Sequence, residues 1–173
     1  MWPDDRRGRP AAGRIPVART GAVSDDARVD LTLEPVTADN WRACAALTVH
    51  PGQREYVNAV THYLCLCHYG DVWQPLAAVR DGEVVGFCMW GIDDDRSRWI
   101  GGVVVDAGRQ RTGIGRALVR TLMDRLAAEP DCPNVALSYR PENEVARALY
   151  ASLGFVETGE TDDDEIVARW TKP

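Results

Sequence analysis

The 173-residue sequence contains no run of eighteen or more apolar residues, and its N-terminus lacks the apolar stretch of a secretory signal. It also lacks an excess of positive charge, since the net charge is -6 at pH 7. These absences argue against a membrane-spanning segment, secretion and a nucleic-acid surface. We therefore expect a cytoplasmic protein with no membrane or nucleic-acid partner, whose charge suits a cationic small molecule.

The cysteines argue against a disulfide framework, because their number is odd and most of them stand in apolar segments. The five cysteines are Cys44, Cys65, Cys67, Cys88 and Cys132. Ligand-type residues crowd together at His62, Cys65, Cys67 and His68. On one helix these four side chains do not share a face, so we predict core packing there and no metal site.

Length and composition predict a single globular domain, with 45% hydrophobic residues, 27% charged residues and a mean hydropathy of -0.28. Residues 1–28 combine glycine, proline and charge without periodicity, which predicts a flexible N-terminal leader outside the core. The folded domain is expected to occupy residues 29–173.

The hydrophobic pattern predicts alternating strands and helices. Alternation at 29–34 indicates a strand, and a helix is expected to start near Thr37. One broken or two short helices follow over 50–71, and Asp81-Gly82 marks a hairpin. The remaining pattern gives a central strand, an amphipathic helix, a strand, a helix and a final hairpin. The order β-α-α-β-β-β-α-β-α-β-β predicts a mixed α/β architecture.

A glycine-spaced, basic turn lies within VVVDAGRQRTGIGRALV, residues 103–119. A nucleotide P-loop requires lysine where this sequence has Ile114, and a dinucleotide fingerprint requires glycine where it has Leu118. Two interpretations remain. The turn is either a tight strand-to-helix connection with solvated arginines, or an anion site at a helix N-terminus.

Two motifs in this order resemble the signatures of the GNAT superfamily of N-acetyltransferases. Gln110-x-x-Gly113-x-Gly115 is similar to the family's coenzyme-A loop after the fourth strand. NEVARALYASLGF is similar to the second signature, with Asn143, Tyr150 and a closing Leu-Gly-Phe. The resemblance spans about residues 29–170 and implies an α/β (α+β) fold with a mixed, mostly antiparallel central sheet flanked by helices.

The resemblance implies acetyl-CoA as cosubstrate, attacked directly by an amine. It implies that Tyr150 protonates the departing thiolate as general acid, with packing on Leu149 and Phe155 as the alternative role. The residues implied in coenzyme binding are Val103, Val104, Val105, Gln110, Arg111, Thr112, Gly113, Ile114, Gly115, Arg116 and Asn143.

The general base is not evident from the sequence. Many relatives carry an acidic residue within the fourth strand, where this chain has Gly101 and Gly102 and reaches an acid at Asp106, the far end. The open candidates are a water chain, Glu55, and the run Asp93, Asp94 and Asp95, for which solvated loop charge is the alternative.

Within the superfamily, the chain resembles bacterial spermine/spermidine (diamine) acetyltransferases, through Gln53-x-x-Tyr56-Val57, the DGEVVGFCMWG hairpin and Trp99-Ile100. This predicts a polyamine acceptor held partly by cation–π contacts, although core packing is the alternative for the aromatics. The predicted substrate residues are Gln53, Tyr56, Trp90 and Trp99. An aminoglycoside-type antibiotic, an amino acid or a peptide N-terminus as acceptor, or a non-catalytic acyl-CoA-binding module, stay open. The sequence does not encode the oligomeric state, and the resemblance leaves a homodimer open because many relatives pair.

Overall fold

The computed structural model describes residues 29–172, and the predicted leader, residues 1–28, lies outside them. The strands are β1 Thr32–Pro35, β2 Gln74–Arg80, β3 Glu83–Ile92, β4 Arg98–Val105, β5 Val135–Tyr139, β6 Val156–Asp162 and β7 Glu165–Trp170. The α-helices are α1 Trp41–Ala45, α2 Val60–Tyr69, α3 Ile114–Ala127 and α4 Glu144–Ser152. Two short 3-10 turns are η1 Pro51–Gln53 and η2 Ala107–Arg109.

A seven-stranded sheet runs through the described chain in the order β1-β2-β3-β4-β5-β7-β6. Every neighbouring pair is antiparallel except β4 and β5, which are parallel. The element order and the mixed, mostly antiparallel sheet confirm the fold class predicted from the sequence. No helix within residues 29–172 is long and apolar enough to cross a bilayer.

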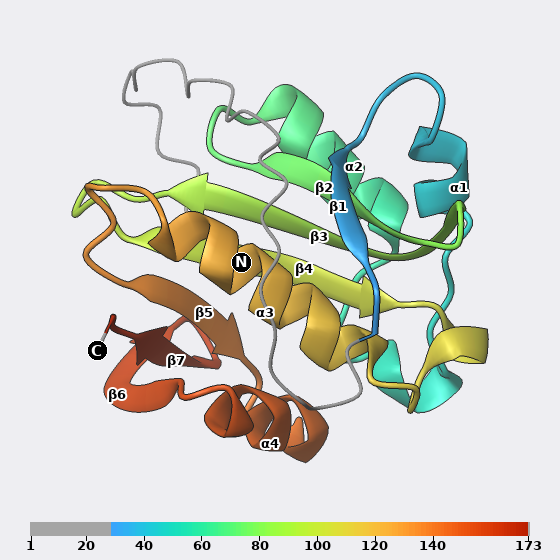
Figure 1. Ribbon diagram of the computed structural model, residues 1–173. Helices are drawn as coiled ribbons and strands as arrows, with labels where there is room; N and C mark the ends of the chain where they lie inside the picture. Colours follow the sequence, from blue (N-terminus) through green and yellow to red (C-terminus); the bar gives the residue numbers. More distant parts are fainter. Residues whose placement is uncertain (1–28, 173) are drawn as a thin grey trace.

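Helices cover both faces of the sheet (Figure 1). The larger core lies on the face of α3 and α4, where Leu118, Leu122 and Leu126 of α3 are fully buried. The opposite face packs against α1 and α2 through a smaller cluster that includes Cys44, Val60 and Phe87. Each face buries the apolar stripe of its helices, as the amphipathic pattern requires.

The first strand and the first helix are shorter than predicted. The strand begins at Thr32 rather than at residue 29, and α1 begins at Trp41 rather than near Thr37. Between them the Asn40 side chain accepts a hydrogen bond from the Thr37 N–H at 2.7 Å. This side-chain bond forms a turn in place of the first helical turn. The predicted hairpin is confirmed, with φ of 52° at Asp81 and 78° at Gly82.

The parallel strands β4 and β5 separate soon after they meet. Their pairing ends at Ile100 and Leu137, so the rest of β4 has no partner on that side. We call this region, Gly101–Val105 of β4 and Ser138–Tyr139 of β5, the fork. Within it the β3–β4 register shifts, which places a bulge at Gly102 with φ of 57°.

Candidate active site

The bulge at Gly102 brings α2 close to the backbone of the fork. A Cβ atom at this position would lie 3.2 Å from the Tyr63 ring. Tyr63 also stacks on Phe87, and its hydroxyl accepts a hydrogen bond from the Asn58 N–H at 3.0 Å. Burial raises the pKa of the Tyr63 phenol. The tyrosine is therefore held over the fork on the α2 face of the sheet.

The glycine turn ends in an uncapped helix N-terminus. Gly113 is the N-cap of α3 with φ of 82°, and no side chain caps the first turn. The first N–H groups of a helix have no partner within it and carry a partial positive charge. The turn therefore offers main-chain donors where an anion can be held.

The three arginines of the turn have different partners. Arg109 pairs with Glu83 at 2.5 Å, and Arg116 donates to the Ser152 hydroxyl at 2.7 Å. Arg111 is exposed with φ of 60°, and it has no ion-pair partner among residues 29–172. Arg111 is thus the arginine whose charge is available to a ligand.

Gln110 and Gln53, predicted for the coenzyme and the acceptor respectively, contact each other. The Gln110 amide donates to Gln53 Oε1 at 2.8 Å and to the main-chain oxygen of Val105 at 3.0 Å. Asp106 adds a second tie, since its carboxylate accepts from the N–H groups of Thr48 and Gly108, both at 3.1 Å. These bonds join the α1–α2 segment to the end of β4 and occupy the Asp106 carboxylate.

Other predicted coenzyme residues have structural roles as well. Asn143 is the N-cap of α4, where its Oδ1 accepts from the Ala146 N–H at 3.1 Å. The Thr112 hydroxyl donates to the Arg109 main-chain oxygen at 2.6 Å. Ile114 is buried in the core, whereas Gly115 is partly exposed. A ligand can therefore still contact the side-chain nitrogen of Asn143 and the main chain of the turn.

Tyr150 lies on α4 with its ring in the larger core. Its side chain is 8% exposed and packs against Tyr139 and Phe155, with ring centroids at 5.5 and 6.0 Å. Its hydroxyl makes no hydrogen bond within the described part of the chain. Burial, followed by the charge of the Glu165 carboxylate, raises the pKa of Tyr150. The phenol is thus kept protonated, as a proton donor must be.

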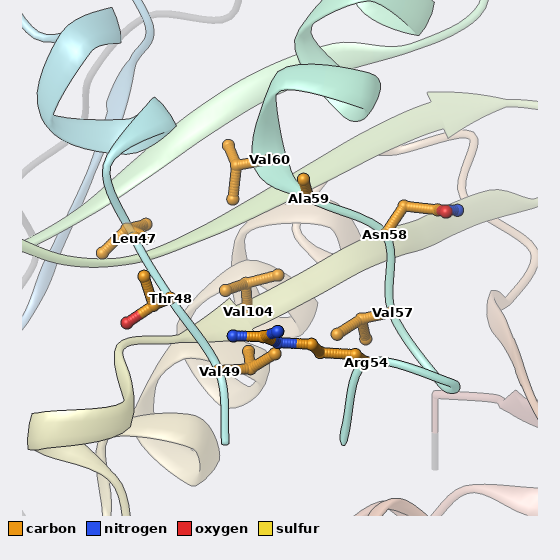
Figure 2. A pocket seen from close by; sticks show the side chains of 9 residues that line it. All are labelled: Leu47, Thr48, Val49, Arg54, Val57, Asn58, Ala59, Val60 and Val104. Atoms are coloured by element: carbon orange, nitrogen blue, oxygen red, sulfur yellow. The ribbon is translucent and has the colours of Figure 1, made fainter. Parts of the chain in front are cut away.

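A cavity of about 350 Å³ lies beside the last residues of β4, on the α1–α2 face (Figure 2). Its lining residues come from the α1–α2 segment and from Val104: Leu47, Thr48, Val49, Arg54, Val57, Asn58, Ala59, Val60 and Val104. In Figure 2 the Arg54 guanidinium reaches across the cavity toward Thr48 and Val49. The lining is thus mostly apolar, with the polar side chains of Thr48 and Asn58 and one cation, and contains no carboxylate.

The predicted acceptor aromatics are not gathered at this cavity. Trp90 is 2% exposed and belongs to the core on the α3 face. Trp99 is 7% exposed, and the Arg169 guanidinium lies 5.6 Å from its ring centroid. The cation–π position on Trp99 is therefore filled by the chain's own arginine. Tyr56 is partly exposed in the turn that follows η1.

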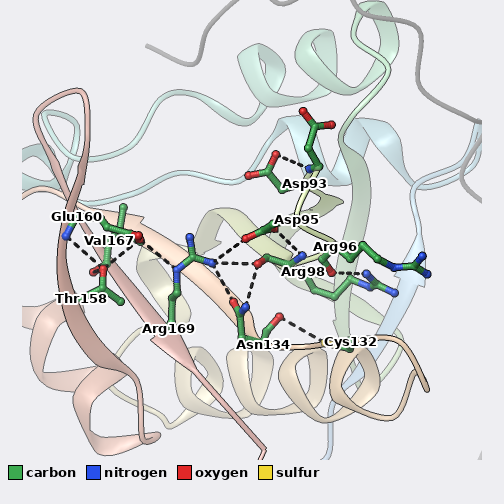
Figure 3. Close-up of polar contacts among 12 residues, drawn as sticks. Asp93, Asp95, Arg96, Arg98, Cys132, Asn134, Thr158, Glu160, Val167 and Arg169 are labelled. Carbon is green, nitrogen blue, oxygen red and sulfur yellow. Dashed lines mark hydrogen bonds and ion pairs between the residues drawn. The ribbon is translucent and has the colours of Figure 1, made fainter.

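The aspartate run 93–95 and the glycine turn lie at opposite ends of β4. At about 3.3 Å per residue, this eight-residue strand is roughly 23 Å long. Asp95 accepts from the Ser97 N–H at 2.8 Å and lies 3.6 Å from Arg169 (Figure 3). Asp93 accepts from the Asp94 N–H at 2.7 Å. Two of these three carboxylates thus hold the β3–β4 turn. The other candidate base, Glu55, is exposed beside η1.

The sequence reasoning missed Glu165 and Ser138. Glu165 opens β7, Ser138 follows the last residue of β5 that pairs with β4, and the serine hydroxyl donates to Glu165 Oε2 at 2.5 Å. The two residues are 27 positions apart, so no local motif joins them. Within residues 29–172, no group of three or more His, Cys, Asp or Glu side chains is arranged to hold a metal ion.

The chain is similar to the members of one known protein family. The model of the acetyltransferase (GNAT) family matches residues 36–155, more than half of the chain. The chain belongs to the GNAT acetyltransferase family. This GNAT protein is thus an N-acetyltransferase, as its two motifs predict. The spermine/spermidine N(1)-acetyltransferase of Bacillus subtilis (strain 168) is 30% identical over 146 residues, which cover 78% of this chain and 93% of the relative.

Other similar proteins are named for a range of acceptors. The [ribosomal protein bS18]-alanine N-acetyltransferase of Escherichia coli (strain K12) is 29% identical over 108 residues, covering 62% of this GNAT chain and 72% of the relative. Among solved structures, aminoglycoside acetyltransferase AAC(6')-Ib in complex with coenzyme A has a TM-score of 0.66 at 20% identity, with 83% and 95% of the two chains covered. Spermidine N-acetyltransferase from Vibrio cholerae, in complex with CoA and spermine, has a TM-score of 0.63 at 20% identity, with 80% and 92% covered. These structures share the fold.

Proposed function

We propose that this GNAT protein transfers the acetyl group of acetyl-CoA to a primary amine of a polyamine such as spermidine or spermine. The observation that carries the choice of acceptor is the 30% identity to the spermine/spermidine N(1)-acetyltransferase of Bacillus subtilis over nearly all of that relative. The acidic balance of the chain, with a net charge of -6, is compatible with a cationic acceptor.

The donor side of the proposed reaction uses the glycine turn and the fork. The first-turn N–H groups of α3 and the charge of Arg111 would hold the pyrophosphate of acetyl-CoA. The free edge of β4 at Val103 and Val104 would hydrogen-bond the pantetheine arm, because β5 no longer pairs with it there. The thioester supplies the activated acetyl group, and the Tyr150 hydroxyl would protonate the sulfur as it departs.

Thiol release measures the proposed function directly. The full chain is incubated with acetyl-CoA and, in turn, spermidine, spermine, an aminoglycoside, an amino acid and a peptide with a free N-terminus. Turnover with a polyamine at the highest kcat/KM of the panel is expected. Turnover with another amine alone would overturn the polyamine acceptor, and coenzyme binding without any turnover would indicate a non-catalytic module.

A second acceptor class is favoured by one observation at the cavity. Arg54 has no ion-pair partner among residues 29–172, and the cavity that it lines contains no carboxylate. Such a cavity suits an amine that also carries an anionic group, such as an amino acid or a peptide, and repels a second ammonium group.

The Arg54→Ala variant separates the two acceptor classes. If the acceptor carries a carboxylate that pairs with Arg54, we expect KM for that acceptor to rise about tenfold, equivalent to about 1.4 kcal/mol. If a polyamine is the acceptor, KM for it stays the same or falls. Arg42→Ala is the matched control, since Arg42 stacks on Trp41 at 4.5 Å and does not line the cavity.

A further inference from the structure

Ser138 and Glu165 lie on the α2 face of the sheet, at the place where β4 and β5 separate. Side chains alternate along a strand, so Ser138 shares its face with Ala136, and Glu165 shares its face with Val167. Ala136 and Val167 pack with Trp99 in one cluster that also contacts Trp73. The Trp73 ring in turn lies over Gly101, which begins the fork on β4. The serine and the glutamate are therefore at the fork.

The Glu165 carboxylate is positioned but not neutralised. Its Oε2 accepts the hydrogen bond from Ser138, while no arginine, lysine or histidine within residues 29–172 forms an ion pair with Glu165. The residue is partly buried. A partly buried carboxylate without a cationic partner is a suitable place for a cation supplied from outside.

Two phenols from opposite faces of the sheet interact electrostatically with this carboxylate. Burial raises the pKa of Tyr63, from α2, and of Tyr150, from α4, and the charge of Glu165 raises both further. The Tyr150 residue is 8% exposed, and its hydroxyl makes no hydrogen bond in the described chain, so it has a free position for a ligand atom. Tyr150 packs against Tyr139, a residue of the fork, from the α4 side, so Glu165 and the proposed general acid lie on the two sides of the same fork.

This inference rests on the acetyl transfer proposed above. We propose that Glu165 receives the ammonium group of the acceptor at the fork and accepts the proton that the amine loses before it attacks the thioester. Ser138 is a positioning residue that orients the carboxylate through its hydrogen bond. The fourth strand carries Gly101 and Gly102 and no acid before Asp106, and β7 would supply an acid from across the fork.

Glu165 and Tyr150 together account for every proton in the proposed reaction. The ammonium group gives one proton to Glu165, and the free amine forms the new C–N bond to the thioester carbonyl carbon while the C–S bond breaks. Tyr150 gives its proton to the departing sulfur. The nitrogen of the new amide releases a second proton, which returns to Tyr150. Glu165 passes the first proton to solvent, so one proton is released for each acetyl group transferred.

Further carboxylates near Glu165 strengthen the attraction for a cation. Burial, and then the charges of Asp163 and Glu165, raise the pKa of Asp162 at the β6–β7 turn. Glu165 also interacts electrostatically with the phenols Tyr63 and Tyr150. A cationic acceptor therefore meets negative charge at the fork, which is the opposite of the charge that Arg54 gives to the cavity beside β4.

The test compares Glu165→Gln with Asp164→Asn, which removes the same charge from the neighbouring, exposed residue of the β6–β7 turn. Each is assayed with the amine that the unmodified chain acetylates best. We expect Glu165→Gln to lower kcat/KM for the amine about 100-fold, which is a typical rate loss when a general base is removed. Affinity for acetyl-CoA stays within threefold of the unmodified chain, and Asp164→Asn keeps the full rate.

The pH profile separates proton acceptance from a structural role. Without Glu165 the amine must arrive already deprotonated, so we expect log kcat/KM of Glu165→Gln to keep rising with pH where that of the unmodified chain levels off. An equal loss at every pH, or a rate within threefold of the unmodified chain, would overturn the proposal. If the unmodified chain acetylates no amine, the proposed function fails together with this inference.

Variants of the serine provide a second, independent measurement that leaves the glutamate in place. Ser138→Ala removes the hydrogen bond to Glu165, and Ser138→Thr retains a hydroxyl. We expect about a tenfold loss of kcat/KM in Ser138→Ala and recovery in Ser138→Thr, because only the alanine variant frees the carboxylate to rotate. Equal rates in the two variants would remove the positioning role of Ser138.

Discussion

At the scale of single residues, Tyr150 is both a core residue and the proposed general acid. Its ring packs in the core against Tyr139 and Phe155, while its hydroxyl has no hydrogen-bond partner within residues 29–172. Removing the oxygen therefore costs no internal hydrogen bond. We expect Tyr150→Phe to lower kcat about 100-fold, since a general acid contributes at least this much, and to leave Tm nearly unchanged.

Tyr139 offers a matched control for this substitution. Its ring is the neighbour of Tyr150, but its hydroxyl donates to Glu157 Oε1 at 2.9 Å. We expect Tyr139→Phe to lose about 1 kcal/mol of stability with that bond and to keep its kcat. Thermal unfolding and thiol release on both variants check the pair. A Tyr150→Phe variant with the full rate would remove the general-acid role.

Residue roles were predictable where a motif stands for a backbone requirement. The sequence places Gly113 in a turn that leads into a helix, and it leaves packing on Leu149 and Phe155 as one of two roles for Tyr150. It does not reveal that the Gln110 amide contacts Gln53, or that Arg169 covers Trp99, because those contacts join residues 57 and 70 positions apart. A side chain's partner depends on tertiary packing, which local pattern does not encode.

At the scale of elements, the bulge in β4 depends on a glycine. Gly102 has φ of 57°, and a Cβ atom there would meet the Tyr63 ring at 3.2–3.3 Å. We expect Gly102→Ala to lower stability by about 1–3 kcal/mol, because the left-handed backbone is strained with a Cβ and the ring must shift. Gly82→Ala is the control for strain alone, since φ is 78° there and a Cβ would meet nothing within 4 Å.

Chemical denaturation of both glycine variants measures the contribution of the ring contact. A larger loss at Gly102 than at Gly82 is the expected result, together with reduced acetyl transfer, since the shifted ring lies over the fork. Equal losses would show that the contact with Tyr63 contributes nothing.

The order of elements followed from periodicity and turn signals, and the Asp81-Gly82 hairpin formed as predicted. Element lengths were less predictable, since an Asn40 side chain replaces the first turn of α1. The fork itself was not predictable from the pattern. It arises where the parallel β4–β5 pairing stops after three residue pairs, which depends on how the two strands twist apart.

At the scale of the whole molecule, the two ends of β4 are held differently. At its start, Arg98 is 2% exposed and its guanidinium donates to Glu129 and Asp131, both at 2.7 Å. Arg169 joins the same end by donating to Ser97 and Asn134 (Figure 3). At its other end, the glycine turn leaves main-chain donors and Arg111 without such partners. Internal charge pairs hold the first end, whereas the second end keeps uncapped main-chain donors that a ligand can use.

Coenzyme binding should therefore stabilise the whole fold through this second end. A ligand that binds the folded chain alone adds about 2.7 kcal/mol at 100 times its Kd. Arg111→Gly removes the unpaired charge and also relieves a left-handed residue with φ of 60°. We expect acetyl-CoA affinity to fall about tenfold in this variant, which reduces the gain at the same concentration to about 1.4 kcal/mol. Thermal unfolding with and without acetyl-CoA measures the stability of the variant alone and the stability that the coenzyme adds.

Without the coenzyme, Arg111→Gly should unfold at an equal or higher temperature than the unmodified chain. Arg120→Ala changes an exposed position further along α3 and should keep the full stabilisation by acetyl-CoA. An unchanged coenzyme-dependent shift in Arg111→Gly would show that the main-chain donors of α3 suffice to hold the pyrophosphate.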